Sequence, residues 1–282
     1  MSAETRSVTL SAGRKLSTGD RIPQLSQFWG LYARELLKTF RNPFVILITL
    51  VQPFMWLAFF GGMFSTVPPA ALQGLGIHGA SYLSFLLPGV LATGMMSIGM
   101  FGSMSTIQDK RFGFMKRILL TPTTKATVYL TKALGSATRG LVQVPVMLVA
   151  ALAFGVTLHG DLLSWCAWIL GLVFLGFGFS AFFLALTASS TDWQTPGVIS
   201  NFITMPLMFA SGAMMPSSIY PSWMKVIADV NPVGFSASLS RDSLTFGVFT
   251  SADVTTLAWL GAFALLMMVI GTLIASKYLR VE

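Results

Sequence analysis

The feature that most constrains this chain is a series of six apolar stretches, each long enough to cross a lipid bilayer. A transmembrane helix needs about 20 consecutive, mainly apolar residues. Spans are predicted at residues 43–64, 82–107, 128–158, 162–188, 196–215 and 257–275. The third begins in a more polar stalk, and its apolar part covers residues 141–158. The expected fold class is therefore an all-α polytopic membrane protein whose transmembrane domain covers residues 43–275.

The composition excludes an ordinary soluble domain. The chain is 54% hydrophobic and 10% charged, whereas soluble domains carry roughly 25% charged residues. Its net charge is +8, but the cations lie between the apolar stretches and form no uninterrupted basic tract, so we expect no nucleic-acid partner. Cys166 is the only cysteine, which excludes an internal disulfide, and its apolar surroundings predict a buried, inert thiol.

The distribution of Lys and Arg predicts how the spans are oriented. The segment before the first span holds seven cations, the 108–140 segment between the second span and the apolar part of the third holds another seven, and the tail at 276–282 adds two. The 65–81 and 158–161 loops hold none, and the 216–256 segment holds two. Because cytoplasmic loops are enriched in Lys and Arg, both termini are expected in the cytoplasm and the chain in the cell (inner) membrane.

The N-terminal region is expected to have two parts. Residues 1–24 are polar and are expected to be disordered. Residues 25–42 are expected to form an amphipathic helix in the inner headgroup layer, with Arg34, Lys38 and Arg41 facing anionic lipid. Its apolar residues recur at helical spacing: Phe28, Trp29, Tyr32, Leu36 and Phe40. The alternative is a disordered tail that runs straight into the first span.

What the spans lack narrows the function. No Asp, Glu, Lys, Arg or His lies in the apolar core of any span, although carriers driven by protons or ions usually need such groups there. There is no glycine-rich phosphate loop, and His78 and His159 with one cysteine do not supply a zinc site. We therefore expect no enzyme activity and a separate energy source. An ion-coupled secondary carrier, an intramembrane enzyme and a membrane scaffold remain alternatives.

The segment after the second span has a distinctive order of residues. An acidic residue is followed by a glycine, a short helix of mixed apolar and cationic character, and Thr121-Pro122. Pro122 cannot continue the helix and ends it. Such a short rigid element between two long spans is suited to transmit force, and the alternative is a basic loop that only fixes topology. The residues of interest are Asp109, Phe112, Gly113, Phe114, Met115, Lys116, Arg117 and Ile118.

A second ordered set of residues lies between the fifth and sixth spans. It predicts an amphipathic helical hairpin that dips into the outer leaflet, since helices satisfy their own backbone groups there. The alternative is a surface loop on top of the bundle. The residues are Pro216, Pro221, Trp223, Asn231, Pro232 and Arg241.

Both segments resemble the ABC-2 family of transporter permeases, which includes daunorubicin-type drug exporters and polysaccharide and lipo-oligosaccharide exporters. In that family the first segment is the coupling helix that docks on the nucleotide-binding subunit, and the second is the outer re-entrant element. The chain departs from the family pattern in one place. The family usually has Glu followed by Gly-Thr, where this chain has Asp109 and Gly113-Phe114.

The resemblance implies a working unit of two permease chains, as a homodimer or a heterodimer, and two copies of an ATP-binding cassette subunit. ATP and Mg would be bound by that partner, so no cofactor is expected in this chain. The implied cargo is hydrophobic or amphipathic: a drug, lipid, glycolipid or polysaccharide. Spans two and five would line its path, with Met96, Met100, Met205, Met208 and Phe209 as candidate contacts. The alternative is that these side chains face lipid or only pack.

Overall fold

The computed structural model describes residues 24–41, 43–77, 81–120, 123–188, 190, 192 and 194–278. Within these residues the chain consists of helices and turns, without a β-strand. The elements in chain order are α1 Gln24–Phe40, α2 Pro43–Phe64, α3 Pro69–Gly74, α4 Tyr82–Arg111, α5 Phe114–Leu119, α6 Lys125–Ala153, α7 Leu162–Ala188, α8 Gln194–Phe209, η1 Ser217–Ile219, α9 Ser222–Ala228, α10 Pro232–Arg241, η2 Asp242–Phe246 and α11 Ser251–Tyr278.

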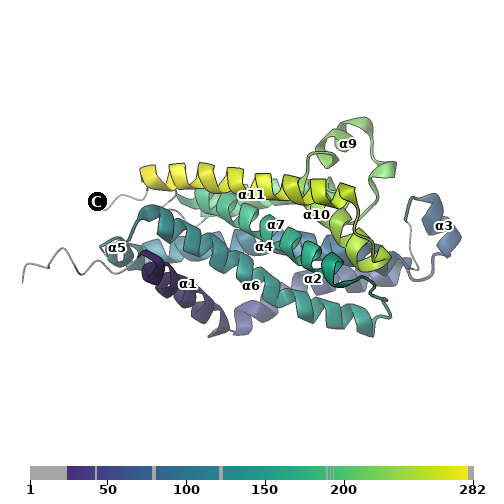
Figure 1. The fold of residues 1–282 in the computed structure, drawn as a ribbon, viewed down its shortest axis with the longest axis horizontal. Coiled ribbons are helices and arrows are strands. Elements are labelled where there is room, and N and C mark those ends of the chain that lie inside the picture. Colours follow the sequence, from purple (N-terminus) through teal and green to yellow (C-terminus); the bar gives the residue numbers. More distant parts are fainter. Residues whose placement is uncertain are drawn as a thin grey trace, which may run out of the picture.

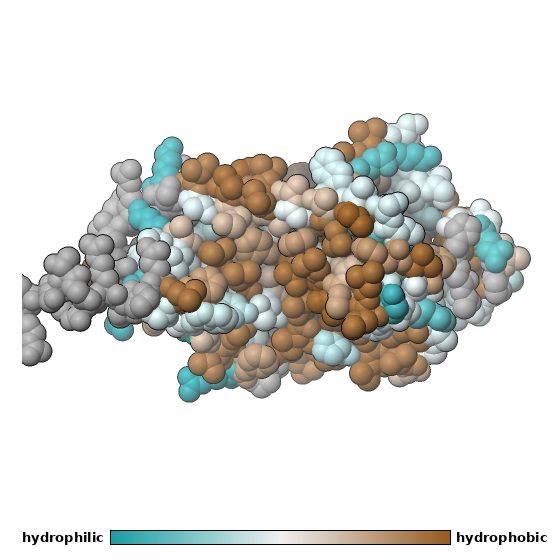
Figure 2. Space-filling model, viewed as in Figure 1, coloured by the Kyte–Doolittle hydropathy of each residue, from teal (hydrophilic) through white to brown (hydrophobic). Residues whose placement is uncertain are grey.

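The long helices run side by side along the longest axis of the molecule (Figure 1). α1 and α5 lie at one end, called here the α5 end, and α3 and α9 lie at the other, called the α9 end (Figure 1). α4 is the central helix. In its most apolar stretch 89% of the residues are buried within the bundle, whereas only 17% are buried in the most apolar stretch of α11. A band of hydrophobic side chains covers the middle of the visible face, and hydrophilic side chains gather toward both ends (Figure 2).

Four helices in the described part of the chain are long and apolar enough to cross a membrane: α4, α6, α7 and, over Ser251–Ile274, α11. α2 is apolar as well, and the part of it whose side chains are described without interruption is Thr49–Phe64. The all-α class is therefore confirmed for a membrane protein with several apolar helices.

Polar side chains fix where the helices begin. Ser81 accepts a hydrogen bond from the Ser84 amide before α4, and Thr124 accepts one from the Thr127 amide before α6. Asp161 does the same for the Ser164 amide at the start of α7. Such caps satisfy amides that have no partner within the helix.

The helix within the predicted fifth span, residues 196–215, ends before the span does. α8 stops at Phe209, and residues 210–215 form a turn. Gly212 there has a φ of +70°, a left-handed conformation that favours glycine. Tyr220 donates from its hydroxyl to the Phe209 carbonyl at 2.7 Å, which caps the last turn of α8.

Other predicted boundaries shift as well. α6 includes the predicted stalk and ends at Ala153 rather than at residue 158. Gly155, just beyond its end, adopts a φ of +81°. α11 begins at Ser251 and runs into the predicted tail 276–282. The predicted disordered segment 1–24 lies outside the described residues apart from Gln24, which begins α1. His78, Thr121 and Pro122 also lie outside them.

The apolar core is formed mainly by α4 and α7, with contributions from α6 and α10. Gly89 of α4 lies so close to Ala213 that a Cβ atom there would overlap the Ala213 backbone. The prediction that Cys166 is buried is wrong, because its side chain is exposed on α7. The apolar sequence around Cys166 does not indicate which of its residues face the core and which lie on the outer face of the bundle.

Candidate functional site

Buried charged side chains gather at the α5 end, where α1, α4 and α6 meet. Lys132 Nζ donates to an Asp109 carboxylate oxygen at 2.6 Å and to Glu35 at 3.4 Å. These three residues are only 5–7% exposed. From α1, Lys38 Nζ lies 3.1 Å from Asp109 and Arg34 lies 3.7 Å from it. One carboxylate of α4 thus connects cations from two other helices.

The face of α1 that packs on the bundle is polar. Tyr32 and Thr138 share a hydrogen bond of 2.7 Å between their hydroxyls, and Arg139 Nε donates to Thr39 at 2.9 Å. The expectation that Arg34 and Lys38 face anionic lipid is wrong, since Asp109 draws both inward. The apolar residues of α1 include several that are exposed instead: Leu25, Trp29, Leu37 and Phe40.

The end of α4 is also tied to α7. Lys110 Nζ donates to the backbone carbonyls of Ala188 at 2.5 Å and Thr187 at 3.2 Å, and to that of Ser190 at 3.4 Å. A cation at this position offsets the partial negative charge of a helix C-terminus and satisfies its last carbonyls. Asp109 and Lys110 therefore join α4 to α1, α6 and α7.

The predicted short helix after α4 is present as α5. Gly113 links the two helices with a φ of +68°. Met115 and Ile118 are 4% and 6% exposed and belong to an apolar cluster with residues of α6 and α7, which includes Val128 and Leu184. These two side chains therefore hold α5 on its own bundle.

Other residues of this segment face outward. Phe112 is 84% exposed, and Arg117 is exposed as well. Phe114 is 37% exposed, and the Arg34 guanidinium lies 3.8 Å above its ring, a cation–π arrangement. The side chain of Lys116 lies outside the described part of the structure.

A cavity of about 660 Å³ opens beside the charged cluster. We call it the α5-end cavity. Lys38 and Arg139 contribute to its polar part, whereas Met100, Phe101 and Met104 of α4 supply apolar wall. Its remaining lining residues are Thr39, Thr49, Ser105, Gln108, Gln194, Gly197, Val198 and Asn201.

The structure does not bring the five candidate cargo contacts together in one cavity. Met100 lines the α5-end cavity. Met96 and Met208 are 0% and 5% exposed and lie in the core. Met205 and Phe209 are 63% and 47% exposed on the surface of α8.

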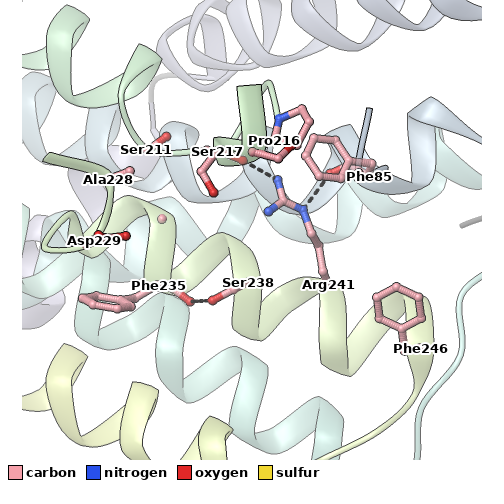
Figure 3. Close-up of a pocket in the computed structure, with 14 residues that line it drawn as sticks. Phe85, Ser211, Pro216, Ser217, Ala228, Asp229, Phe235, Ser238, Arg241 and Phe246 are labelled. Atoms are coloured by element: carbon pink, nitrogen blue, oxygen red, sulfur yellow. Dashed lines mark hydrogen bonds between the residues drawn. The ribbon is translucent and has the colours of Figure 1, made fainter. Parts of the chain in front are cut away.

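At the α9 end, Arg241 connects three segments. Its Nε donates to the Phe85 carbonyl at 3.2 Å, and one Nη donates to the Gly212 carbonyl at 2.8 Å (Figure 3). The same Nη donates to the Ala213 carbonyl at 3.0 Å. Its guanidinium also lies 3.8 Å from the centre of the Phe85 ring. These residues border a cavity of about 430 Å³.

The rest of the predicted hairpin forms η1, α9 and α10. Pro216 and Pro221 precede η1 and α9, and Trp223 on α9 is 67% exposed. Asn231 caps α10 by accepting from the Val233 amide at 3.0 Å, and its side-chain amide donates to the Leu207 carbonyl at 2.7 Å. Pro232 occupies the first turn of α10, a position where its missing N–H carries no penalty.

Sequence reasoning missed Glu35, Thr39, Lys132 and Arg139 as parts of a common site. Lys132 and Arg139 are seven residues apart and thus share one face of α6. Glu35 and Thr39 are four apart on α1. This spacing is a usable signal, but the two pairs lie in segments interpreted separately, as a polar stalk and as an interface helix. No metal site is indicated, because no three His, Cys, Asp or Glu side chains gather in the part of the chain that the structure describes.

Comparison with known proteins decides the family. The profile of ABC-2 type transporters matches residues 26–245, a range that includes the charged cluster, α5 and the α9–α10 hairpin. The chain belongs to the ABC-2 type transporter family. Members are membrane subunits of ABC transporters that work with a separate ATP-binding subunit.

Individual relatives agree with this assignment. The chain is 27% identical to a putative transport permease, ycf38, of Pyropia yezoensis, over 77% of its own length and 73% of the relative. It is 25% identical to the daunorubicin resistance ABC transporter permease protein DrrB1 of Streptomyces coeruleorubidus, over 70% and 66% of the two chains. The ABC-2 assignment therefore extends across most of the molecule.

Proposed function

We propose that this chain is the permease subunit of an exporter that moves a hydrophobic or amphipathic cargo outward across the cell membrane. Two permease chains, identical or related, would assemble with two copies of a separate ATP-binding subunit. The observation that carries the proposal is the construction of α5. Met115 and Ile118 fasten it to the bundle, while Phe112 beside it is 84% exposed.

Six spans with both termini in the cytoplasm fit this function. α2 has 22 residues and α8 has 16. At about 1.5 Å per residue, α8 reaches roughly 24 Å, less than the bilayer core of about 30 Å. The turn after α8 and the α9–α10 hairpin would complete that crossing. The α5 end would be cytoplasmic because the most cation-rich segments adjoin it.

A second permease chain would cover apolar surface on α2 and α8. Both helices expose large apolar side chains that a second permease chain could cover. The exposed residues include Phe44, Leu47, Val51, Phe59 and Met63 on α2 and Val198, Phe202 and Met205 on α8.

Force would pass from the ATP-binding subunit through α5 into the bundle. α5 follows α4 after a single turn, and the end of α4 is fixed to α1 and α6 by Asp109 and to α7 by Lys110. A displacement of α5 would therefore move four helices together. We assign Asp109 to this internal connection rather than to direct contact with the partner, because its carboxylate is buried.

The alternative, an ion-coupled secondary carrier, would need a buried group that gains and loses an ion. Glu35 and Asp109 are the buried carboxylates at the α5 end, and both are paired with cations. A pH step applied to proteoliposomes that contain the permease alone would decide. The proposal expects no uphill transport, and transport driven by the pH step would refute it.

The docking role of α5 is tested by Phe112→Ala. We expect this variant to insert normally and to lose most of its association with the ATP-binding subunit, because truncation of a buried interface anchor typically costs over about 2 kcal/mol. Co-purification of the two subunits and ATP-dependent export measure the effect.

The matched control is Leu162→Ala, which truncates a side chain that is 81% exposed at the start of α7, at the opposite end of the bundle. It should leave complex yield unchanged. Met115→Ala should lower the stability of the permease itself, because Met115 packs inside this chain. Normal complex yield and export in Phe112→Ala would remove the support for docking through α5.

A further inference from the structure

The α5-end cavity combines a charged part with an apolar wall. Lys38 and Arg139 lie on its lining beside Gln108, and Met100, Phe101 and Met104 form the apolar wall. A cavity of about 660 Å³ is within the usual range for small-molecule sites. Its lining therefore suits a molecule with a charged head and an apolar body.

Arg139 determines the sign of the charge that the cavity favours. Its side chain is 9% exposed, and its Nε donates to Thr39. Among the residues that the structure describes, no carboxylate lies within 4.0 Å of its guanidinium. The Glu35 carboxylate acts on Arg139, but it is also paired with Lys132 and Arg34. The charge of this buried cation is therefore only partly balanced, which is costly. An anion in the cavity would offset that cost, and a guanidinium is well suited to bind phosphate or carboxylate through paired hydrogen bonds.

The neighbouring charges support the same conclusion. Among the residues that the structure describes, the cluster holds four cations, Arg34, Lys38, Lys132 and Arg139, and two carboxylates, Glu35 and Asp109. Both carboxylates are engaged by Lys132. The balance is therefore positive next to the cavity, which favours an anion and disfavours a cationic molecule.

We propose that the α5-end cavity binds an amphipathic anion, with a phosphate or carboxylate head at Arg139 and Lys38 and an apolar tail along Met100, Phe101 and Met104. This inference rests on the proposed export function in that it names the class of cargo. Binding does not need the ATP-binding subunit, so a failure to bind and a failure to export are separate results.

The test uses the purified full-length permease in phosphatidylcholine nanodiscs and tritiated dodecyl phosphate as the probe, measured by scintillation proximity. We expect saturable binding that unlabelled dodecyl phosphate displaces. Dodecyltrimethylammonium, with the same tail and a cationic head, should not displace it, and neither should inorganic phosphate at the same concentration. Displacement by the cation would overturn the assignment of an anion, and full displacement by inorganic phosphate would overturn the need for a tail.

Two variants locate the site. Arg139→Gln should weaken binding about tenfold or more, as expected when a hydrogen bond to a charged group is lost. Arg41→Gln is the matched control, since Arg41 is exposed directly after α1 and should have little effect. Equal weakening by both variants would show general attraction to a basic surface and would refute the site.

Met104→Trp keeps the test decisive if Arg139→Gln proves unstable. It narrows the cavity at its apolar wall and leaves every cation in place, so the proposal expects loss of binding, and unchanged affinity would contradict it.

Nanodiscs that contain phosphatidylglycerol then identify the source of the anion. A lower apparent affinity for dodecyl phosphate would make a bilayer lipid the occupant, whereas an unchanged affinity would point to a separate amphiphile. Both results support an amphipathic anion.

Discussion

Asp242 is a carboxyl group whose ionisation opposes folding. Burial raises the pKa of Asp242 to about 6, and its neighbour Asp253 adds to the rise. The folded chain then holds a proton that the unfolded chain releases near the ordinary value of 3.8. Because the folded state binds more protons in this window, stability falls as the pH rises from about 3.8 to about 6 and is constant above it.

Asp242→Asn should therefore stabilise the protein above about pH 6. The amide retains the shape of the carboxyl group and carries no charge to desolvate. We expect a higher Tm than that of the native chain at neutral pH and equal Tm values near pH 3.8, measured by fluorescence melting in a neutral detergent. Asp229→Asn, which changes an exposed carboxyl group directly after α9, is the control. A Tm difference that does not vary with pH would contradict this explanation.

At the scale of elements, the contact between α4 and the turn after α8 depends on the absence of a side chain at Gly89. Gly89→Ala would drive a Cβ atom into the Ala213 backbone, and forced overpacking costs about 1–3 kcal/mol. The Tm of this variant should fall. Gly62→Ala on α2 meets nothing within 4 Å and should be neutral or stabilising by up to about 1 kcal/mol. A Tm that is unchanged in Gly89→Ala would mean that this contact is not tight.

The sequence was sufficient to predict elements whose signal is local. The helix at α2 coincides with the predicted span, and α5 lies where glycine and proline bracket a short run. It was not sufficient to predict which way a side chain faces. Met115 and Arg117 are two residues apart, yet one is buried and the other exposed, because the partner surface comes from α6 and α7.

The same limit explains the errors at α1 and α8. The helical spacing of apolar residues in α1 indicated a helix correctly, but the inward face is set by Asp109, which is 71 residues from Lys38 in the chain. The C-terminal end of α8 is set by Tyr220 and by a glycine in a left-handed turn. Hydropathy alone continues through that turn, since residues 210–215 are mainly apolar.

For the whole molecule, chemical labelling of introduced cysteines tests the orientation of the bundle in the membrane. In a Cys166→Ala background, cysteines at Gln73 and Ser218 should react with an impermeant reagent applied to intact cells, because both positions are exposed at the α9 end. A cysteine at Thr123, beside α5, should react only after permeabilisation. Labelling of Thr123 in intact cells would overturn the orientation and, with it, the proposed direction of export.

The contacts of Arg241 also have a consequence for biogenesis. Its acceptors precede it by 156 residues at Phe85 and by 28 residues at Ala213. Synthesis therefore delivers every acceptor before the arginine leaves the ribosome. A guanidinium cannot settle among apolar helices until those carbonyls are in position, so we expect α4 and the end of α8 to be assembled first. In that order of events, α10 closes a site that its predecessors have already built.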